Sequence, residues 1–362
     1  MKLTIWQKRN LITGLKLTGS SILIALIYAV FSDGFAEWLP FFNAFLIGLV
    51  GGGIISFLEL DVFVRKGSDL PFILKFALRT FIYVVLFVSL VPLIVLVNES
   101  VYYERTLREH YYSEHFQSFL YREDFEIILI YILVFIAIII FTRLMNQKLG
   151  QGVLWNYITG NYYKPREENR IFMFVDLRSS TRIAEGMTNL QYHRFIKDFF
   201  KDLTEPILRH GGIIYQYVGD QVRVTWKWQK PNTNADCLRA YHNIKSALHS
   251  RREHYLDAYG IVPEFSTSVH CGKVISGELG DVKSQIVFMG DTIVELSVIE
   301  KCFGQHELKE PILLSDRLLE YVQLPALFNA EPVCNIKLSG KRFELFTLRE
   351  RSSRSFAVDY SS

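Results

Sequence analysis

The chain has 362 residues, 50% of them hydrophobic, and a formal net charge of only +3 at neutral pH. This length allows two or three domains. So small a net charge gives no indication of a nucleic-acid partner, because binding to a phosphate backbone needs concentrated basic charge. The cysteines form no CxxC pair, so a zinc site is not expected. They are Cys237, Cys271, Cys302 and Cys334.

Hydrophobic residues are concentrated before residue 150, in four runs long enough to cross a membrane. A helix needs roughly 17–25 apolar residues to span a bilayer core of ~30 Å. The runs are Leu11–Ser32, Leu39–Leu60, Ile73–Val97 and Phe125–Phe141. We therefore expect an all-α, four-helix transmembrane domain over residues 1–140. The first run lacks a small-x-small cleavage site, so we expect it to stay as an anchor.

Lysine and arginine cluster before the first run and in its opening turns, between the second and third runs and just inside the third, and after the fourth. These residues are Lys2, Lys8, Arg9, Lys16, Arg65, Lys66, Lys75, Arg79, Arg143 and Lys148. Because short cytoplasmic loops carry an excess of Lys and Arg, both ends of this domain are predicted to be cytoplasmic. The sequence thus predicts a multi-pass protein of the cell inner (plasma) membrane.

Three features of the hydrophobic half predict specific contacts. Gly48 and Gly52 form a GxxxG pattern, which allows close helix packing within or between subunits. Glu59 and Arg79 are expected to pair near the inner boundary, because an unpaired charge in a membrane is costly. The segment Asn98–Asp124 is either an external sensor or a short amphipathic helix on the membrane surface, and its pattern favours the helix.

After the fourth run the sequence turns polar and predicts a connecting helix and linker over 141–168. The helix is expected to continue to about Tyr157 before Gly160 and Pro165 break it. From 169 to 350 strand and helix patterns alternate, and 351–362 is a C-terminal tail. The expected strands are 170–176, 212–219, 222–228, 264–277, 285–289 and two within 332–348. The expected helices are 187–210, 233–258, 291–303 and a turn near 315–322.

Two apolar runs of this domain each lead into an aspartate, Asp176 after IFMFV and Asp220 after IIYQYVG. Short apolar runs bounded by turn residues are typical of buried strands. Two strand-end carboxylates side by side in one sheet make a site for divalent cations, which prefer oxygen ligands. The alternative is that Asp220 is only the turn residue of a hairpin. The two aspartates together favour the metal site.

Five ordered blocks extend this pattern: FMFVDLRSSTRIAE, GGIIYQYVGDQVRVTW, HCGKVISGELG, IVFMGDT and SGKRFELFTL. Together they resemble the class III adenylate/guanylate cyclase catalytic domain, of the type found in membrane-anchored bacterial adenylate cyclases. The resemblance covers about residues 168–350. It implies an α+β, ferredoxin-like βαββαβ fold that works as a head-to-tail dimer, with ATP or GTP as substrate and two Mg²⁺ or Mn²⁺ ions as cofactors.

The resemblance also implies roles for one half of a site. Asp176 and Asp220 match the catalytic, metal-binding aspartates, and Leu177 would lend a backbone carbonyl to a metal. The following loop would offer backbone N–H groups to the triphosphate, as a helix entrance can. Its residues are Arg178, Ser179, Ser180 and Thr181.

In the other half, the sequence departs from the family. The family has an adenine-reading Lys, a base-contacting Asp or Thr, an Asn and an Arg that orient the ribose and stabilise the transition state, and a basic residue for the terminal phosphates. These positions fall on Gln216, Val287, Val294, Val298 and Ser339, with Lys341 close to the last. The base-and-transition-state half is therefore degenerate, whereas the metal half is intact.

Three functions follow as hypotheses. The first is a membrane-anchored cyclase that converts ATP to 3′,5′-cyclic AMP and pyrophosphate in signalling. Its activity alone is doubtful, because losing one transition-state donor typically costs ~10²–10³ in rate. The second is a catalytically silent homologue that binds nucleotide or a regulatory partner. The third is the metal-donating subunit of a heterodimer with a second cyclase chain.

Overall fold

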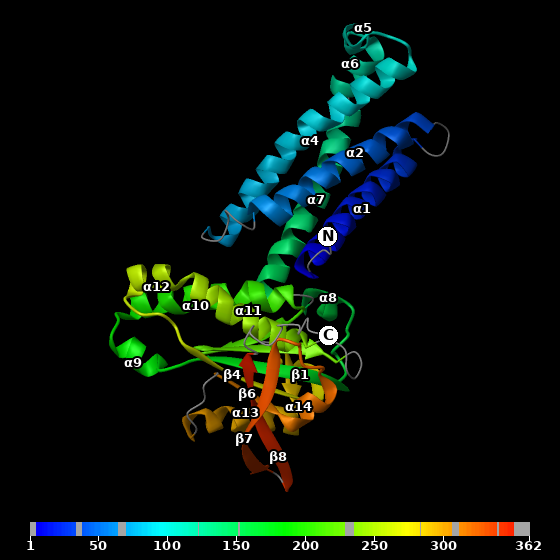
Figure 1. Cartoon of the computed structure of the whole chain (residues 1–362). Helices are drawn as coiled ribbons and strands as arrows, with labels where there is room; N and C mark the ends of the chain where they lie inside the picture. The colour runs from blue at the N-terminus through cyan, green and yellow to red at the C-terminus, as the bar shows by residue number, and fades with distance from the viewer. Residues whose placement is uncertain are drawn as a thin grey trace, which may run out of the picture. The chain divides into compact units, whose positions relative to one another are not determined.

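The structure, a computed structural model, describes most of the chain. The described ranges are 5–33, 38–63, 70–121, 123–150, 153–228, 235–282, 284–305, 311–338 and 340–350. The chain divides into two compact units, Met1–Leu149 and Gly150–Ser362, and each is described by itself (Figure 1). The predicted tail at 351–362 and Ser339 lie outside the described residues.

The first unit is a bundle of long helices with two short ones at one end (Figure 1). Its elements are α1 (Ile5–Asp33), α2 (Trp38–Phe57), the π-helical turn η1 (Leu58–Val62), α4 (Phe72–Tyr102), α5 (Leu107–Tyr111), α6 (Glu114–Tyr121) and α7 (Glu123–Leu149). Four segments are long and apolar enough to cross a membrane: Leu11–Ser32, Trp38–Val62, Phe72–Tyr102 and Phe125–Asn146. The prediction of four apolar helices is confirmed.

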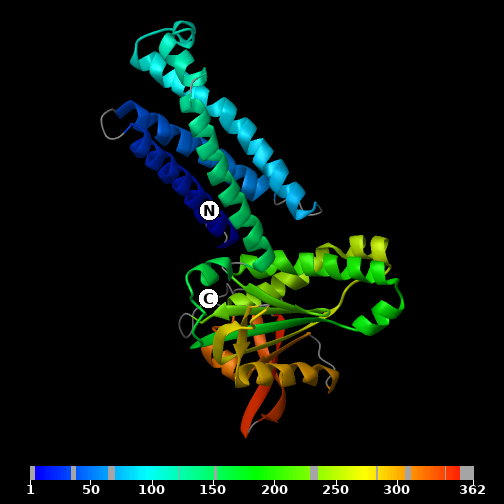
Figure 2. The ribbon, with the colours of Figure 1, turned by 180° about the vertical axis from the view of Figure 1, so that it is seen from behind.

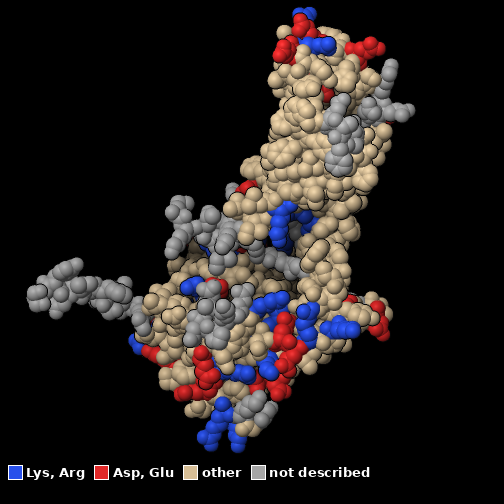
Figure 3. Space-filling view, turned by 90° about the vertical axis from the view of Figure 1, so that its right-hand side faces the viewer, with Lys and Arg blue, Asp and Glu red and all other residues tan. Residues whose placement is uncertain are grey.

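Figure 2 shows the bundle from the side on which α7 faces the viewer. In Figure 3 most of the bundle's length is free of Lys, Arg, Asp and Glu on the visible face, and charged side chains gather at the tip formed by α5 and α6. An uninterrupted apolar surface of this kind suits a hydrocarbon environment.

The close approach of α1 and α2 depends on the two glycines of the GxxxG pattern. A Cβ added to Gly48 would lie 2.6 Å from the Cα of Ile22, and one added to Gly52 would lie 2.8 Å from the Cβ of Ser21. Larger residues would therefore push the helices apart, and the pattern acts within the subunit.

The expected pair of Glu59 and Arg79 is confirmed, with Arg79 Nη1 2.9 Å from Glu59 Oε2. The connecting helix differs from the prediction. Helix α7 ends at Leu149, Gly150 adopts a left-handed φ of 100°, and a separate helix α8 covers Val153–Ile158. A glycine in this conformation is a common helix terminator, so the prediction of one helix to about Tyr157 is wrong.

The second unit is built on a mixed sheet with the strand order β2-β3-β1-β4-β6-β8-β7, and β5 pairs with β4. Its strands are β1 (Arg166–Leu177), β2 (Ile213–Val218), β3 (Gln221–Lys227), β4 (Phe265–Leu279), β5 (Gln285–Met289), β6 (Ile312–Ser315), β7 (Phe328–Leu338) and β8 (Lys341–Glu350). The segment from β1 to β4 has the βαββαβ order, and its strands lie as β2-β3-β1-β4. The predicted ferredoxin-like α+β fold is thereby confirmed.

Helices cover both faces of the sheet, with α10, α11 and α12 on one face and α13 on the other (Figure 1), and Leu318 of α14 packs in the core on the α10 and α11 side. The helices are α9 (Ser180–Glu185), α10 (Asn189–Arg209), α11 (Asp236–Ser250), α12 (Arg252–Tyr259), α13 (Asp291–Lys301), the 3₁₀ turn η2 (Cys302–Gln305) and α14 (Asp316–Tyr321). The sequence pattern missed α9 and β6. It also merged α11 and α12, which separate at Arg251, where ψ is 6° instead of helical.

Successive side chains of β1 point to opposite faces of the sheet, as the pleat of a strand requires. Met173 and Val175 pack in the core on the α10 and α11 side. Phe172 and Phe174 pack with Leu296 of α13 on the other side. Asp176 follows in the same alternation, so its carboxylate belongs to the α13 face of the sheet, at the end of the strand.

Candidate functional site

The two aspartates predicted to bind metal meet at one corner of the sheet. Asp176 is the penultimate residue of β1 and pairs in register with Gln221 of β3. Asp220 immediately precedes Gln221, in the tight turn that joins β2 to β3. Gly219 makes this turn possible, because it adopts a φ of 60° that other residues rarely tolerate.

The carboxylates at this corner repel each other. Burial, and then the negative charge of Asp220, raise the pKa of Asp176 to about 6. The hydroxyl of Tyr192, on α10, is hydrogen-bonded to Ser180, and burial together with the two aspartate charges raises the pKa of this tyrosine. Like charges that share a site resist simultaneous ionisation. A cation placed here would relieve that repulsion.

A third carboxylate, Glu300, reaches the same region from the end of α13, and the sequence analysis did not identify it. Its Oε1 accepts a short hydrogen bond from the Gln221 amide. Burial and then the charge of Asp176 raise the pKa of Glu300 to about 7, although Arg223 acts in the opposite direction. No sequence spacing relates Glu300 to the aspartates, because only the packing of α13 on the sheet brings them together.

Arg223 links this acidic corner to Gln216, the position predicted to read the base. Its Nε donates to Gln221 Oε1 at 2.7 Å, and its Nη1 donates to Gln216 Oε1 at 3.3 Å. The guanidinium lies over the Phe174 ring, 4.6 Å from the centroid. Gln221 and Arg223 are two residues apart on β3, so the period-two alternation was a signal in the sequence that they share a face.

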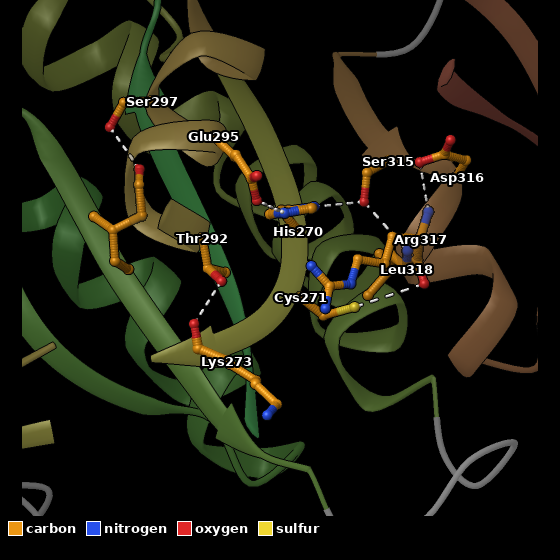
Figure 4. A network of polar contacts seen from close by, with 11 residues as sticks. His270, Cys271, Lys273, Thr292, Glu295, Ser297, Ser315, Asp316, Arg317 and Leu318 are labelled. Atoms are coloured by element: carbon orange, nitrogen blue, oxygen red, sulfur yellow. Dashed lines mark hydrogen bonds and ion pairs between the residues drawn. The ribbon is translucent and has the colours of Figure 1, made fainter. Parts of the chain in front are cut away.

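Helix α13 is held in place by a buried polar chain, drawn in Figure 4. Ser315 Oγ accepts from the Leu318 N–H at 3.2 Å, and Ser315 Oγ lies 2.7 Å from His270 Nδ1. On the other side of the ring, Glu295 Oε2 accepts from His270 Nε2 at 3.0 Å. His270 and Glu295 are 0% and 2% exposed, so these hydrogen bonds are shielded from water.

A second contact brings the start of α13 against β4. Thr292 Oγ1 donates to the Lys273 carbonyl at 2.8 Å (Figure 4). A Cβ on Gly272 would lie 2.4 Å from Thr292 Oγ1, so only glycine permits this approach. With Glu295 fixed inward, the neighbouring Val294 is turned outward and is 58% exposed.

The other predicted site residues lie at the following places. Leu177 is buried at the end of β1, Arg178 and Ser179 form the turn after it, and Ser180 and Thr181 begin α9. Gln216 is exposed on β2, Val287 is half-buried on β5, and Val298 is half-buried on α13. Lys341 begins β8, but its side chain is not described. The structure thus brings the metal aspartates, Leu177 and the 178–181 turn together at one corner.

The donor set suits a hard divalent cation that is held partly by its substrate. Within the described ranges, no group of three or more His, Cys, Asp or Glu side chains is placed to form a metal cage. Mg²⁺ in nucleotide sites is commonly held by one or two carboxylates together with phosphates and water. The aspartate pair, with its unfavourable mutual repulsion, fits that arrangement.

The chain is similar to known nucleotide cyclases, although its sequence matches no family model. The chain is 30% identical over 221 residues to adenylate cyclase 2 of Rhizobium meliloti, covering 61% of this chain and 60% of that protein. It is 25% identical over 177 residues to an adenylate cyclase of Anabaena cylindrica, covering 47% of this chain and 34% of that protein. The chain thus spans less than two thirds of the length of these curated relatives.

A solved structure of a bacterial light-regulated adenylyl cyclase superposes on this one with a TM-score of 0.51. The two are 17% identical, and the superposition covers 59% of this chain and 62% of that chain. At this identity the likeness concerns the fold.

Proposed function

We propose that the chain is a class III nucleotide cyclase and that it converts ATP to 3′,5′-cyclic AMP and pyrophosphate at a site containing Asp176 and Asp220. The observation that carries this proposal is the pair of carboxylates at the corner between β1 and the β2–β3 turn, where burial and mutual charge raise the pKa of Asp176. A carboxylate pair that has no counter-cation among the described residues favours binding of divalent cations with a polyphosphate.

Class III cyclases use divalent metal ions, and the corner offers ligands for two Mg²⁺ or Mn²⁺ ions. Asp176, Asp220 and the Leu177 carbonyl would hold them. When bound, the ions would supply positive charge at the ribose 3′-hydroxyl and at the triphosphate. The turn at 178–181 would bind the triphosphate, with Lys341 near its terminal phosphates.

On the base side, Gln216 would contact the purine beside Val287. Arg223 donates a hydrogen bond to Gln216 Oε1, so the side-chain N–H groups of Gln216 would donate to the base. Both adenine and guanine carry ring acceptors, so this contact alone does not choose between ATP and GTP. The similarity to proteins named adenylate cyclases supports ATP.

A second function is favoured by the surface of α13, where the family's ribose-orienting and transition-state groups are replaced by Val294 and Val298. Val294 is 58% exposed and Val298 half-buried, and neither can donate a hydrogen bond. In a homodimer this surface would leave each site without those groups. The chain would then act as a metal-donating subunit beside a complete cyclase chain, or as a silent regulatory partner.

We further propose that the four apolar helices anchor the protein in the inner membrane with both of their ends cytoplasmic. This orientation rests on the distribution of Lys and Arg. It places the cyclase unit where ATP is available, and dimerisation would join two such units.

The deciding experiment measures cyclic AMP and cyclic GMP formation by the full-length protein with Mg²⁺ or Mn²⁺. Asp176→Asn serves as the inactive control, and a known active cyclase as the positive control. Turnover that disappears in Asp176→Asn supports the enzyme. A folded protein that binds Mg²⁺–ATP without turnover favours the subunit or regulator, and adding candidate paralogues separates these two. If neither binding nor turnover responds to the metal, the assignment of the corner is wrong.

A further inference from the structure

The membrane unit contains a cavity of about 730 Å³ between its long helices α1, α2, α4 and α7. Cavities that bind small molecules typically have volumes of roughly 300–1,000 Å³. The lining residues come from the second half of α1 and of α4 and the first half of α7, and α6 contributes His115, Ser118 and Phe119. The cavity therefore runs from the middle of the bundle toward the end formed by α5 and α6.

The cavity wall is mostly hydrocarbon with several aromatic rings. Tyr28 and Tyr131 lie against each other with centroids 5.0 Å apart, and Phe87, Phe119 and Phe135 also face the space. Aromatic faces attract cations electrostatically, and the attraction grows when the cation is removed from water. Apolar walls with aromatic rings suit an organic molecule with a hydrocarbon body.

One ionisable group stands out at the α6 end of the cavity. Glu99 is 8% exposed and lines the cavity, and the described residues of the lining include no Lys or Arg. Its Oε2 accepts from His110 Nε2 at 2.9 Å, and His115 Nε2 lies 3.7 Å away on a side chain that is 65% exposed. Arg105 lies 5.9 Å from the Tyr103 ring, outside the lining.

His110 fixes the position of the Glu99 carboxylate. Its ring is 0% exposed, and its Nε2 lies 2.9 Å from Glu99 Oε2. Within the described part of the chain, Nδ1 of the same ring has no hydrogen-bond partner. Among the described side chains, histidines alone lie within ion-pair distance of this carboxylate. The cavity wall therefore presents an acidic group at this end with no lysine or arginine paired to it among the described residues.

We propose that this cavity binds a lipophilic cation, with an ammonium-type head near Glu99 and an apolar body among the aromatic and aliphatic walls. The charge complementarity selects this occupant. A neutral acyl chain would leave the carboxylate with only its histidine contacts in an apolar environment, whereas a cationic head would pair with it. An anionic amphiphile would be repelled by it. The proposal concerns the membrane unit and does not depend on cyclase activity.

The test uses the full-length protein in phosphatidylcholine nanodiscs and decyltrimethylammonium as the probe. Equilibrium dialysis measures binding after the signal of empty nanodiscs has been subtracted. Decanol is the neutral probe of the same chain length. Glu99→Gln removes the charge but keeps the shape and an acceptor for His110. Glu109→Gln is the matched control, because Glu109 is an exposed acid of α5 that does not line the cavity.

We expect saturable binding of one decyltrimethylammonium per chain, at least about tenfold weaker in Glu99→Gln and unchanged in Glu109→Gln. Ala44→Phe, which places a ring in the cavity without touching the charge, should also abolish saturable binding. The proposal is overturned if folded Glu99→Gln binds the cation as the wild type does. It is equally overturned if decanol competes as strongly as the cation, since the cavity would then be a site for neutral lipid.

Discussion

The two units of this protein both bury acidic groups, but they treat the charge in opposite ways. In the membrane unit, Glu59 is 1% exposed and is surrounded by donors: Arg79 at 2.9 Å, Arg143 at 3.1 Å and the Tyr83 hydroxyl at 2.9 Å. In the cyclase unit, Asp176 faces another carboxylate, and the nearby Arg223 is occupied by two glutamines.

The difference distinguishes a buried carboxylate that stabilises the fold from one that is available to bind a ligand. Glu59 lies in a π-helical turn and connects three membrane helices, and its charge is fully compensated within the chain. Among the described residues no cation compensates Asp176, whose neighbouring charge is that of Asp220, so a cation from outside would be needed to compensate it. A chain that tolerates an uncompensated buried carboxylate forgoes stability there, which is expected at a site that binds a charged ligand.

The largest effect is expected from Asp176→Asn. Removing one of the two carboxylates proposed to bind metal should lower turnover by at least about 10³-fold, while thermal stability stays equal or rises because a like-charge repulsion is lost. Cyclic-nucleotide formation and an unfolding curve measure the two effects on the same preparation. Asp281→Asn, at an exposed acid of the same unit, should change neither. A stable variant with wild-type turnover would contradict the metal assignment.

At Glu59, whose charge is compensated by Arg79 and Arg143, we expect a substitution to lower stability. Arg79→Leu should destabilise the membrane unit by about 3 kcal/mol or more, because Glu59 keeps its charge but loses its closest cation. The unfolding midpoint in detergent measures this. Arg143→Leu should cost less, because that side chain is 19% exposed. Equal midpoints for all three proteins would show that Glu59 is not held by its charge partners.

In the cyclase unit, restoring polar groups on α13 should increase turnover. The double substitution Val294→Asn and Val298→Arg restores a hydrogen-bonding group and a cation to the α13 surface, and should raise cyclase turnover about tenfold or more. Initial rates with Mg²⁺ and ATP measure it, and Val294→Ala serves as the control that changes the surface without adding a donor. A folded double variant that gains nothing would place the deficiency elsewhere.

The smallest effect concerns His210, a half-buried histidine whose ring contacts the Asn243 amide and, among the described residues, no ion partner. Burial, and then Arg239 and Arg209, lower the pKa of His210 from 6.5 to about 4. As the pH falls through 6.5 the unfolded chain takes up this proton before the folded chain does, so stability decreases between pH 6.5 and 4. Comparing unfolding midpoints at pH 7 and 4.5 for wild type and His210→Gln tests this. The variant should show a shallower decrease, and identical slopes would contradict it.

Local patterns predicted much of the fold because they depend on neighbours in the chain. The apolar runs predicted four long helices, and alternating residues predicted β4 and β5 nearly to their ends. The two aspartates were identified because each directly follows a strand pattern. The break at Gly150 was missed, since a glycine is compatible with both a continuing helix and a terminated one. Strand β6 was missed because a four-residue apolar segment carries too little periodicity.

By itself, the sequence determined the apolar helices, the strands and the residue types at the corner, since hydrophobic periodicity and turn chemistry are local properties. Only the tertiary structure decided which charges meet. It brought Glu300 to the aspartates, placed Arg223 between Gln221 and Gln216, and left Glu99 beside a cavity with a single histidine hydrogen-bonded to it. Such contacts join residues far apart in the chain, and their energies depend on burial and distance, which no local pattern contains.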